Sequence, residues 1–267
     1  METNSFPIIQ IFNGHRKQTP DILAREEFLE ICVNGCPYAL CMRLPGDDYN
    51  LIKGYCFSEG LIQSNQDILD LETSVNERGE ERINIILNVN VDIGTKLEQK
   101  DSLYVSQSSS GLGGKKTVQE VIKDIYPVDY TCCLGYQDLF HIKEIFESKM
   151  EVFSVTGCTH ACSVFSSSLE LAAFAEDIGR HNAFDKAIGQ ILSYGVLDQS
   201  NLCLVSSRLS FEMVQKAGRL GSEILAGFSA VTSMALNLAA DLNITLIGFL
   251  RGQRFNIYTH SKRILVE

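Results

Sequence analysis

Residues 201–250, NLCLVSSRLSFEMVQKAGRLGSEILAGFSAVTSMALNLAADLNITLIGFL, determine the predicted fold class. The segment contains three short apolar runs, at 201–207, 223–229 and 245–250, each of the length of one strand. Between the runs, apolar residues recur at three- and four-residue intervals, which is typical of helices. Strands and helices that alternate over short connections require right-handed crossovers. We therefore predict an α/β fold with a largely parallel sheet covered by helices.

The first part of the chain predicts a smaller α+β unit. Asn34-Gly35 separates two strand-like runs and predicts a β-hairpin over residues 26–43. Asp47 or Asp48 opens a helical pattern, and residues 81–91 alternate as in a strand. We expect a small α+β domain at 1–105, a Ser/Gly-rich loop at 106–116, an α/β domain at 117–267, and helices at 117–125 and 139–150.

The composition argues against several classes of protein. The chain has 267 residues, is 45% hydrophobic and carries a formal net charge of −10. A protein this acidic is a poor candidate for sequence-independent binding to nucleic acid or to a membrane surface. Its nine cysteines are scattered and odd in number, which favours reduced thiols over a disulfide framework. The sequence shows no signal-peptide pattern and no apolar membrane span, so we expect a cytoplasmic protein.

Polar residues gather at the carboxyl ends of the three predicted strands, the edge at which open α/β sheets bind ligands. Arg208 follows the first apolar run, and Arg251 and Arg254 follow the third. Hydroxyls at Ser210 and Thr232 stand where the next helices begin. Guanidinium groups, hydroxyls and free helix N–H groups together predict an anion site, most simply for a phosphate or pyrophosphate. The alternative is that these arginines are solvated or paired with acids.

A second candidate lies in residues 176–192, EDIGRHNAFDKAIGQIL. His181 and Asp185 are four residues apart, a spacing that on a helix places two side chains within reach of each other. A histidine oriented by a carboxylate can serve in proton transfer or in ligand binding. The alternative is a purely structural pair beside a helix start.

The segment TGCTHACSV, at 156–164, raises the question of a metal. On a strand, Cys158, His160 and Cys162 would share one face, but such neighbours lie roughly 6.6 Å apart along the chain. One tetrahedral zinc with bonds of about 2.0–2.3 Å cannot easily gather three ligands at that spacing. We therefore predict no metal site, with the cysteines and the histidine buried or facing a ligand.

Residues 108–114, SSSGLGG, are followed by Lys-Lys-Thr and invite comparison with a phosphate-binding P-loop. The P-loop pattern requires a glycine where Ser109 stands and a serine or threonine where Lys116 stands. Both requirements fail, so the segment is not a P-loop.

Six motifs in order along the chain resemble one family, the formate dehydrogenase accessory sulfurtransferases (FdhD/NarQ). They are GYCFSEGLI, TGCTHA, EDIGRHNAFDK, SSRLSFEMVQKA, GFSAVTSMA and TLIGFLRGQRFNIYTH. The resemblance covers the chain from about residue 25 to the C-terminus. It implies a small N-terminal domain joined to a cytidine-deaminase-like α/β domain, usually paired as a homodimer.

The resemblance also implies a function. Proteins of this family receive sulfur from a cysteine desulfurase and pass it to the molybdenum bis(molybdopterin guanine dinucleotide) cofactor of formate dehydrogenase. The family's cofactor site includes the turn after the last parallel strand, and we place His181 and Arg208 in the same site, with GDP as a partial mimic of the cofactor. That turn consists here of Phe249, Leu250, Arg251, Gly252, Gln253 and Arg254.

One departure from the family pattern concerns catalysis. Where the family has S-S-C-G-x-C-G-K, this chain has SSSGLGGK at 108–115, so that Ser110 occupies the persulfide position and Gly113 the second cysteine position. A hydroxyl cannot hold a persulfide, since a thiolate is the form that attacks sulfur. Cys158 is the best substitute among the remaining thiols, because Cys32, Cys36, Cys41, Cys56 and Cys203 lie in apolar strand or helix patterns and are expected in the core.

Three hypotheses follow from this departure. The first is an accessory protein of formate dehydrogenase maturation that retains sulfur transfer by an altered route. The second is a non-catalytic homologue that binds or hands on the cofactor as a chaperone. A third is a nucleotide-binding regulator that recognises only the guanosine diphosphate part of the cofactor.

Overall fold

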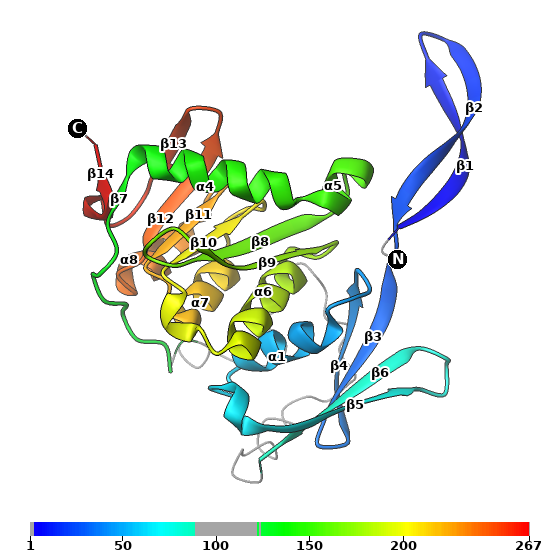
Figure 1. Cartoon of the computed structure of the whole chain (residues 1–267), viewed down its shortest axis with the longest axis horizontal. Coiled ribbons are helices and arrows are strands. Elements are labelled where there is room, and N and C mark those ends of the chain that lie inside the picture. Colours follow the sequence, from blue (N-terminus) through cyan, green and yellow to red (C-terminus); the bar gives the residue numbers. More distant parts are fainter. Residues whose placement is uncertain (1–2, 89–121, 123, 267) are drawn as a thin grey trace.

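The computed structural model describes residues 3–88, 122 and 124–266. A six-stranded sheet lies at its centre, with helices on both faces (Figure 1). The strands of this sheet, in spatial order, are β13 (Arg254–Ile257), β12 (Thr245–Arg251), β11 (Ile224–Gly227), β10 (Leu202–Val205), β8 (His160–Phe165) and β9 (Leu171–Asp177).

The predicted parallel arrangement is confirmed for the three central strands. β10 pairs with β11, and β11 with β12, in parallel. The outer pairings, β10 with β8, β8 with β9 and β12 with β13, are antiparallel. The sheet as a whole is therefore mixed rather than largely parallel. The reason is local, because the short turns between β8 and β9 and between β12 and β13 allow only antiparallel neighbours.

Helices cover both faces of the six-stranded sheet, which explains why its central strands are apolar runs in the sequence. One face is covered by α4 (Tyr136–Lys149), which is followed by the short α5 (Glu151–Thr156). The other face carries α6 (Arg180–Tyr194), α7 (Phe211–Leu220) and α8 (Ser233–Asp241). Along β10, Leu202 and Leu204 belong to the core beneath α4, whereas Cys203 and Val205 belong to the other core. Since both faces are buried, every residue of β10 is apolar.

The N-terminal part forms a four-stranded sheet in the order β4-β3-β6-β5. The predicted hairpin is confirmed as β3 (Glu27–Val33) and β4 (Cys36–Arg43), and Asn34 and Gly35 adopt the left-handed φ values of 49° and 80° that such a turn requires. The predicted helix is α1 (Asp48–Ser58). The predicted strand at 81–91 is β6 (Glu81–Leu87), which pairs with β5 (Ile68–Val75).

Two glycines bring α1 into direct backbone contact with α6. A Cβ atom on Gly54 would lie 1.8 Å from the carbonyl oxygen of Asp185, and one on Gly189 would lie 1.9 Å from that of Asn50. Any side chain at either glycine would therefore force the helices apart. The larger core runs through this contact, since it contains residues from both sides of the boundary expected between the domains.

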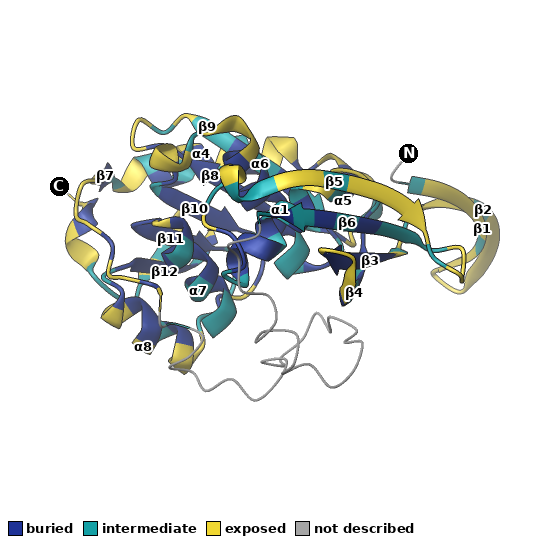
Figure 2. Cartoon of the chain, turned by 90° about the horizontal axis from the view of Figure 1, so that it is seen from below, coloured by how far each residue is buried: buried dark blue, intermediate teal, exposed yellow. Residues whose placement is uncertain are grey.

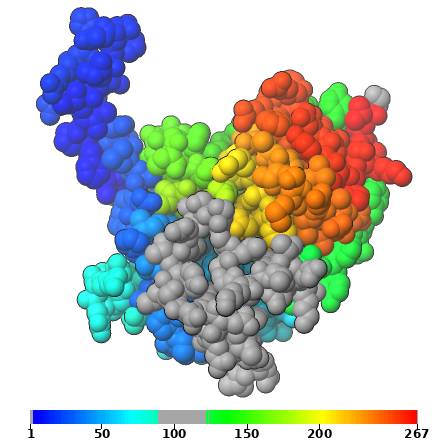
Figure 3. Space-filling model, turned by 180° about the vertical axis from the view of Figure 1, so that it is seen from behind, coloured from blue at the N-terminus to red at the C-terminus, as the bar shows by residue number. Residues whose placement is uncertain are grey.

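An additional β-hairpin was not predicted. Among the strands that the structure describes, β1 (Thr3–Phe12) and β2 (His15–Ala24) pair with each other alone, and they project from the body of the molecule (Figures 1 and 3); we call residues 3–24 the arm. Its turn, Asn13-Gly14, carries the same signal as Asn34-Gly35 and could have been found from the sequence. Figure 2 shows the arm and β5 as largely exposed, in contrast to the buried strands of the central sheet.

The C-terminal segment is fastened to the body by a buried ion pair. β14 (Ile264–Leu265) pairs with β7 (Leu134–Gly135), and the adjacent Arg263 donates to the Glu223 carboxylate over 3.1 Å. The predicted helix at 139–150 is confirmed as α4, whereas the loop at 106–116 and most of the helix expected at 117–125 lie outside the described residues. Among the described residues, no helix is both long and apolar enough to cross a bilayer.

Candidate functional site

The candidate site lies at the sheet edge where the three parallel strands end. β10, β11 and β12 end there, and α6, α7 and α8 begin there. The antiparallel β8 starts at the same edge, since Cys162 lies opposite Val205 of β10. This register brings His160 beside Ser206, with 3.3 Å between Nδ1 and Oγ. Segments far apart in the sequence thus converge at one end of the sheet.

Four groups that can carry positive charge gather at this edge. They are His160 on β8, Arg180 and His181 in the first turn of α6, and Arg208 after β10. Burial lowers the pKa of His160, and the charges of Arg180 and Arg208 lower it further. Burial likewise lowers the pKa of Arg180, and Arg208 contributes to that shift. Because each of these groups disfavours the charge of its neighbours, the cluster is suited to an anion that would relieve the repulsion.

His181 is the most strongly perturbed member of this cationic cluster. Burial lowers its pKa to about 3, and Lys216, Arg180 and His160 act in the same direction. The carboxylate of Glu212 lies 3.4 Å from Nε2 of this histidine. His181 is therefore a neutral imidazole near neutral pH, able to donate or accept a hydrogen bond but carrying no charge.

Polar atoms in the cluster remain without partners among the described residues. The Nε atom of Arg180 and the hydroxyl of Ser210 are buried and make no hydrogen bond. Ser210 is the N-cap of α7 but forms no capping bond, and the N-cap of α6 is Gly179, which has no side chain to form one. Two helix N-termini with free N–H groups thus meet a guanidinium and a hydroxyl, an arrangement that binds an anion such as a phosphate.

The prediction that Asp185 orients His181 is wrong. Asp185 does not face the histidine, because its carboxylate accepts hydrogen bonds from Lys216 Nζ over 2.5 Å and from Ser58 over 2.6 Å. Burial raises the pKa of Asp185, and Lys216 opposes that rise. Asp177, the other carboxylate near the start of α6, pairs with Lys186 at 2.8 Å. His181 and Asp185 have the right spacing, but Asp185 points into the α1–α7 contact and holds the helix in place.

The second half of the predicted site is the turn between β12 and β13. Phe249 and Gly252 both have a φ of 54°, a left-handed conformation that turns the chain sharply. The Nε of Arg251 donates to the carbonyl oxygen of Phe228 at the end of β11, over 2.6 Å. Leu250 is fully buried in the core beneath α4. The other members of the turn are exposed or half-buried: Phe249, Arg251, Gly252, Gln253 and Arg254.

The strand ends that carry arginines therefore lie on the same edge of the sheet but at two separate positions along it. Arg208 belongs to the cationic cluster at β8 and β10, whereas Arg251 and Arg254 flank the turn beyond β11. Arg208 and His181 were predicted from the sequence as site residues, whereas Arg180 and Glu212 were not. Arg180 directly follows the N-cap glycine of α6, and that position was the available signal.

The segment around Cys158 does not form one continuous strand. α5 ends at Thr156, the next residue Gly157 reverses the chain with a φ of 69°, and β8 begins only at His160. Cys158 is exposed and its thiol contacts Thr156 Oγ1 at 3.4 Å, whereas Cys162 is buried. No hydrogen bond joins Cys158 to His160, whose Nδ1 faces Ser206. Within residues 3–88 and 124–266, no group of three His, Cys, Asp or Glu side chains is arranged to hold a metal ion.

The remaining cysteines differ in their exposure to solvent. Cys32, Cys41, Cys56 and Cys203 are buried, as expected for core residues, but Cys36 is exposed at the tip of the β3–β4 hairpin and that expectation is wrong. Ser110 and Gly113 lie outside the described residues.

Comparison with known proteins identifies relatives over nearly the whole chain. The model of the FdhD/NarQ family matches residues 24–265. A protein of Sulfurisphaera tokodaii named sulfur carrier protein FdhD is 35% identical over 272 residues, covering 99% of this chain and 100% of the relative. A protein of the same name from Streptomyces coelicolor is 36% identical, over 97% of this chain and 95% of the relative.

A solved structure has the same fold. The crystal structure of a putative formate dehydrogenase accessory protein from Desulfotalea psychrophila superposes with a TM-score of 0.79 over 99% of this chain and 100% of that one, at 24% identity. The family match over 24–265 and the full-length relatives above 30% identity agree with each other and with the motifs at the sheet edge. The chain therefore belongs to the FdhD/NarQ family.

Proposed function

We propose that this protein is an accessory protein of formate dehydrogenase maturation that binds the molybdenum bis(molybdopterin guanine dinucleotide) cofactor of its client at the carboxyl edge of the central sheet. The observation that carries the proposal is the cationic cluster of His160, Arg180, His181 and Arg208, near which Glu212 and the paired Asp177 supply negative charge. Membership of the FdhD/NarQ family supplies the identity of the client.

The residues at the edge fit a ligand that contains diphosphate groups. The free N–H groups at the starts of α6 and α7, Arg180 Nε and the Ser210 hydroxyl would hold phosphate oxygens. Neutral His181 would donate to or accept from the uncharged part of the ligand. The turn from Phe249 to Arg254 would add Arg251 and Arg254 at the far side of β11. GDP, which carries the nucleotide part alone, is the natural probe.

Whether sulfur moves through this chain is the finer question. The relatives are named sulfur carriers, and a carrier needs a thiolate that receives sulfur from a cysteine desulfurase. Here Ser110 and Gly113 replace both cysteines of the carrier loop. Cys158, the best substitute, is exposed, but the histidine nearest in sequence contacts Ser206 and does not activate it. These observations favour the alternative of a cofactor-binding homologue without sulfur transfer.

The remaining parts of the proposal follow from the family. A cysteine desulfurase and formate dehydrogenase are the proposed protein partners, the α/β part is proposed to be cytidine-deaminase-like, and the protein is proposed to act in the cytoplasm as a homodimer. The third hypothesis, a regulator that recognises only GDP, is separated from the cofactor-binding role by comparing the affinity for GDP with that for the complete cofactor.

Calorimetric titration with GDP tests the binding site. Arg180→Gln and Arg208→Gln should each weaken binding by about tenfold or more, since a charged hydrogen bond contributes about 1.5–3 kcal/mol. Lys149→Gln, an exposed change at the end of α4, is the matched control and should leave the affinity unchanged. Equal affinities in the wild type and both arginine variants would disprove the site.

Sulfur transfer has its own test. The protein is incubated with a cysteine desulfurase and free cysteine, and its intact mass is measured. No gain of sulfur, together with retained GDP binding, would support a cofactor-binding role. A gain of one sulfur atom that disappears in Cys158→Ala would instead establish transfer by the substitute thiol.

A further inference from the structure

The start of α6, where two members of the cationic cluster lie, is held by the end of a strand from the N-terminal sheet. β4 ends at Arg43, close to Asp177, the last residue of β9 (Figure 1). The backbone N–H of Leu44 donates to Asp177 Oδ2 over 3.1 Å, and Lys186 Nζ of α6 donates to the carbonyl oxygen of Leu44 over 2.8 Å. Two backbone groups at the end of β4 are therefore bonded to the segment that carries the site.

Asn182, the third residue of α6, makes a second connection to β4. Its Nδ2 donates to the carbonyl oxygen of Met42 over 2.8 Å and to Asp177 Oδ1 over 3.0 Å. One side-chain amide thus joins the first turn of the helix both to β4 and to the end of β9. Because Asn182 directly follows Arg180 and His181 in this turn, its position determines where these two side chains stand.

Asp177 lies at the centre of these hydrogen bonds and is fully buried. Its carboxylate also accepts from the N–H of Gly179 over 2.9 Å and pairs with Lys186 at 2.8 Å. A buried carboxylate with this many donors resists displacement, because moving any donor leaves its charge less well paired. We call this network the clamp. It consists of Met42, Leu44, Asp177, Asn182 and Lys186.

The clamp leaves the start of α6 open to a ligand. Asp177 accepts only the N–H of Gly179, the N-cap, and the first helical hydrogen bond runs from the N–H of Ala183 to the carbonyl oxygen of Gly179 over 2.9 Å. Among the described residues, the N–H groups of positions 180–182 find no acceptor. These N–H groups are the ones expected to hold phosphate oxygens.

We propose that Asn182 is a positioning residue of the cofactor-binding site, through which the end of β4 sets the place of the first turn of α6. The strand end is itself rigid, since Arg43 is fully buried and paired with Asp48 and Glu81. The N-terminal sheet thus takes part in ligand binding without touching the ligand. This inference rests on the proposed function, because the effect of the clamp is measured as ligand affinity.

Calorimetric titration with GDP tests the role of Asn182. Asn182→Ala removes both hydrogen bonds and should weaken binding about tenfold, because the first turn of α6 loses its connection to β4. Asn50→Ala on α1 is the matched control. Asn50 is half-buried like Asn182, and its amide donates to Asp47 over 2.6 Å and accepts from Ser193 over 2.7 Å. The control loses two comparable hydrogen bonds outside the clamp and should leave the affinity for GDP unchanged.

Gly179→Ala disturbs the clamp without removing a hydrogen-bonding group. The new Cβ would lie 3.1 Å from Nδ2 of Asn182 and 3.3 Å from its Cγ, so the amide must shift, whereas the φ of −96° suits alanine. The variant should weaken GDP binding several-fold, yet add little in the Asn182→Ala background, where the atoms that it crowds are absent. Equal effects in both backgrounds would show that the methyl group acts on the ligand directly, which would overturn the inference.

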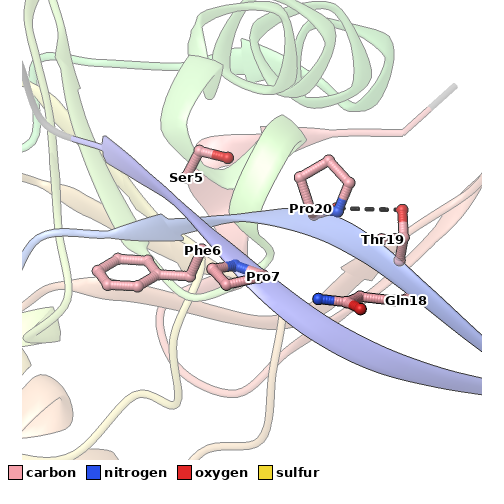
Figure 4. Close-up of a pocket in the computed structure, with 6 residues that line it drawn as sticks. All are labelled: Ser5, Phe6, Pro7, Gln18, Thr19 and Pro20. Carbon is pink, nitrogen blue, oxygen red and sulfur yellow. Dashed lines mark hydrogen bonds between the residues drawn. The ribbon is translucent and has the colours of Figure 1, made fainter.

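Hydrogen exchange followed by mass spectrometry supplies a readout that a merely structural role would not change. If the clamp positions the ligand, the ligand must stabilise the clamp in return. GDP should therefore slow exchange around Leu44 in the wild type but not in Asn182→Ala at saturating GDP. The arm is the internal reference, and its exchange should be the same with and without GDP. Figure 4 shows the hollow between the strands of the arm, which is lined by Ser5, Phe6, Pro7, Gln18, Thr19 and Pro20.

The outcomes separate the inference from the proposed function. Weaker GDP binding by Asn182→Ala, with protection around Leu44 in the wild type alone, would support the inference. Wild-type affinity in Asn182→Ala would overturn the inference and leave the proposed function intact, because GDP still binds. A wild type that binds no GDP would overturn the proposed function and the inference with it. If Asn182→Ala does not fold, protection around Leu44 in the wild type supports the inference, and its absence overturns it.

Discussion

The substitution Gly54→Ala should displace α6, the helix that carries two members of the cationic cluster. α6 begins with Arg180 and His181, and its position is set by the contact with α1. The new Cβ would lie 1.8 Å from the carbonyl oxygen of Asp185, whereas real Cβ contacts are essentially never shorter than 3.0 Å. The two helices must therefore separate by more than about 1 Å, because the obstacle is backbone and cannot rotate away.

The loss in the free energy of unfolding has two sources. Overpacking a tight contact costs typically about 1–3 kcal/mol. The shift also pulls Asp185 from its hydrogen bonds with Ser58 at 2.6 Å and Lys216 at 2.5 Å. Leaving a buried charge without its partner costs about 3–5 kcal/mol, and a lengthened pair loses part of that. We expect the free energy of unfolding to fall by about 3–5 kcal/mol in total.

Urea unfolding followed by circular dichroism measures this loss. The matched control is Gly79→Ala, which makes the same chemical change at a φ of 79° but meets nothing within 4 Å. Its cost should be about 1 kcal/mol, from the backbone conformation alone. If Gly54→Ala destabilised the protein no more than Gly79→Ala, the contact between α1 and α6 would not be what fixes the position of α6. In folded Gly54→Ala, weaker GDP binding would link the contact to the site.

Three further outcomes are expected. GDP should bind more tightly as the pH falls from 7.5 towards 6. Burial and Arg180 lower the pKa of His160 in the free protein, whereas a bound anion raises that pKa, so binding takes up protons. Calorimetry in buffers of different ionisation enthalpy measures the proton uptake, which His160→Asn should abolish. Glu212→Gln should tighten GDP binding several-fold by removing a competing carboxylate, and weaker binding would show that Glu212 positions His181 for the ligand. Glu223→Gln should lower the free energy of unfolding by about 3 kcal/mol, because it leaves Arg263 buried without its partner, and a loss below 1 kcal/mol in urea unfolding would contradict this.

Glu223 and His181 each make the stability of the protein depend on pH, with a definite sign. Burial raises the pKa of Glu223, but hydrogen bonds from Thr131, Cys132 and Arg263 outweigh it and hold the pKa below its ordinary value. Glu223 thus contributes stability above the ordinary pKa of a glutamate, and that stability is lost as the pH falls through the lowered value. His181, with a pKa of about 3, opposes folding as the pH falls below about 6.5, because only the unfolded chain then takes up its proton.

Local patterns in the sequence determined the central strands, the helices between them and the β3–β4 hairpin. Both faces of β10 are buried, which favours the apolar run LCLV. The left-handed turn between β3 and β4 favours Asn34 and Gly35. Such features depend on neighbours within a few positions, so a single sequence carries them. The rule that ligands bind at strand ends also led to Arg208 and the turn at 249–254.

Only the tertiary structure decided which side chains meet. Helical spacing places His181 and Asp185 within reach, yet Asp185 turns towards Lys216 and Ser58, 31 and 127 positions away in the chain, and Glu212 takes its place. His160 meets Arg208 because β8 runs antiparallel beside β10, a register that no local pattern encodes, and Arg180 joins them from the start of α6. A buried carboxylate pairs with whichever cation the packed helices bring to it, since leaving either charge unpaired would cost several kcal/mol, and that choice is made by the whole fold.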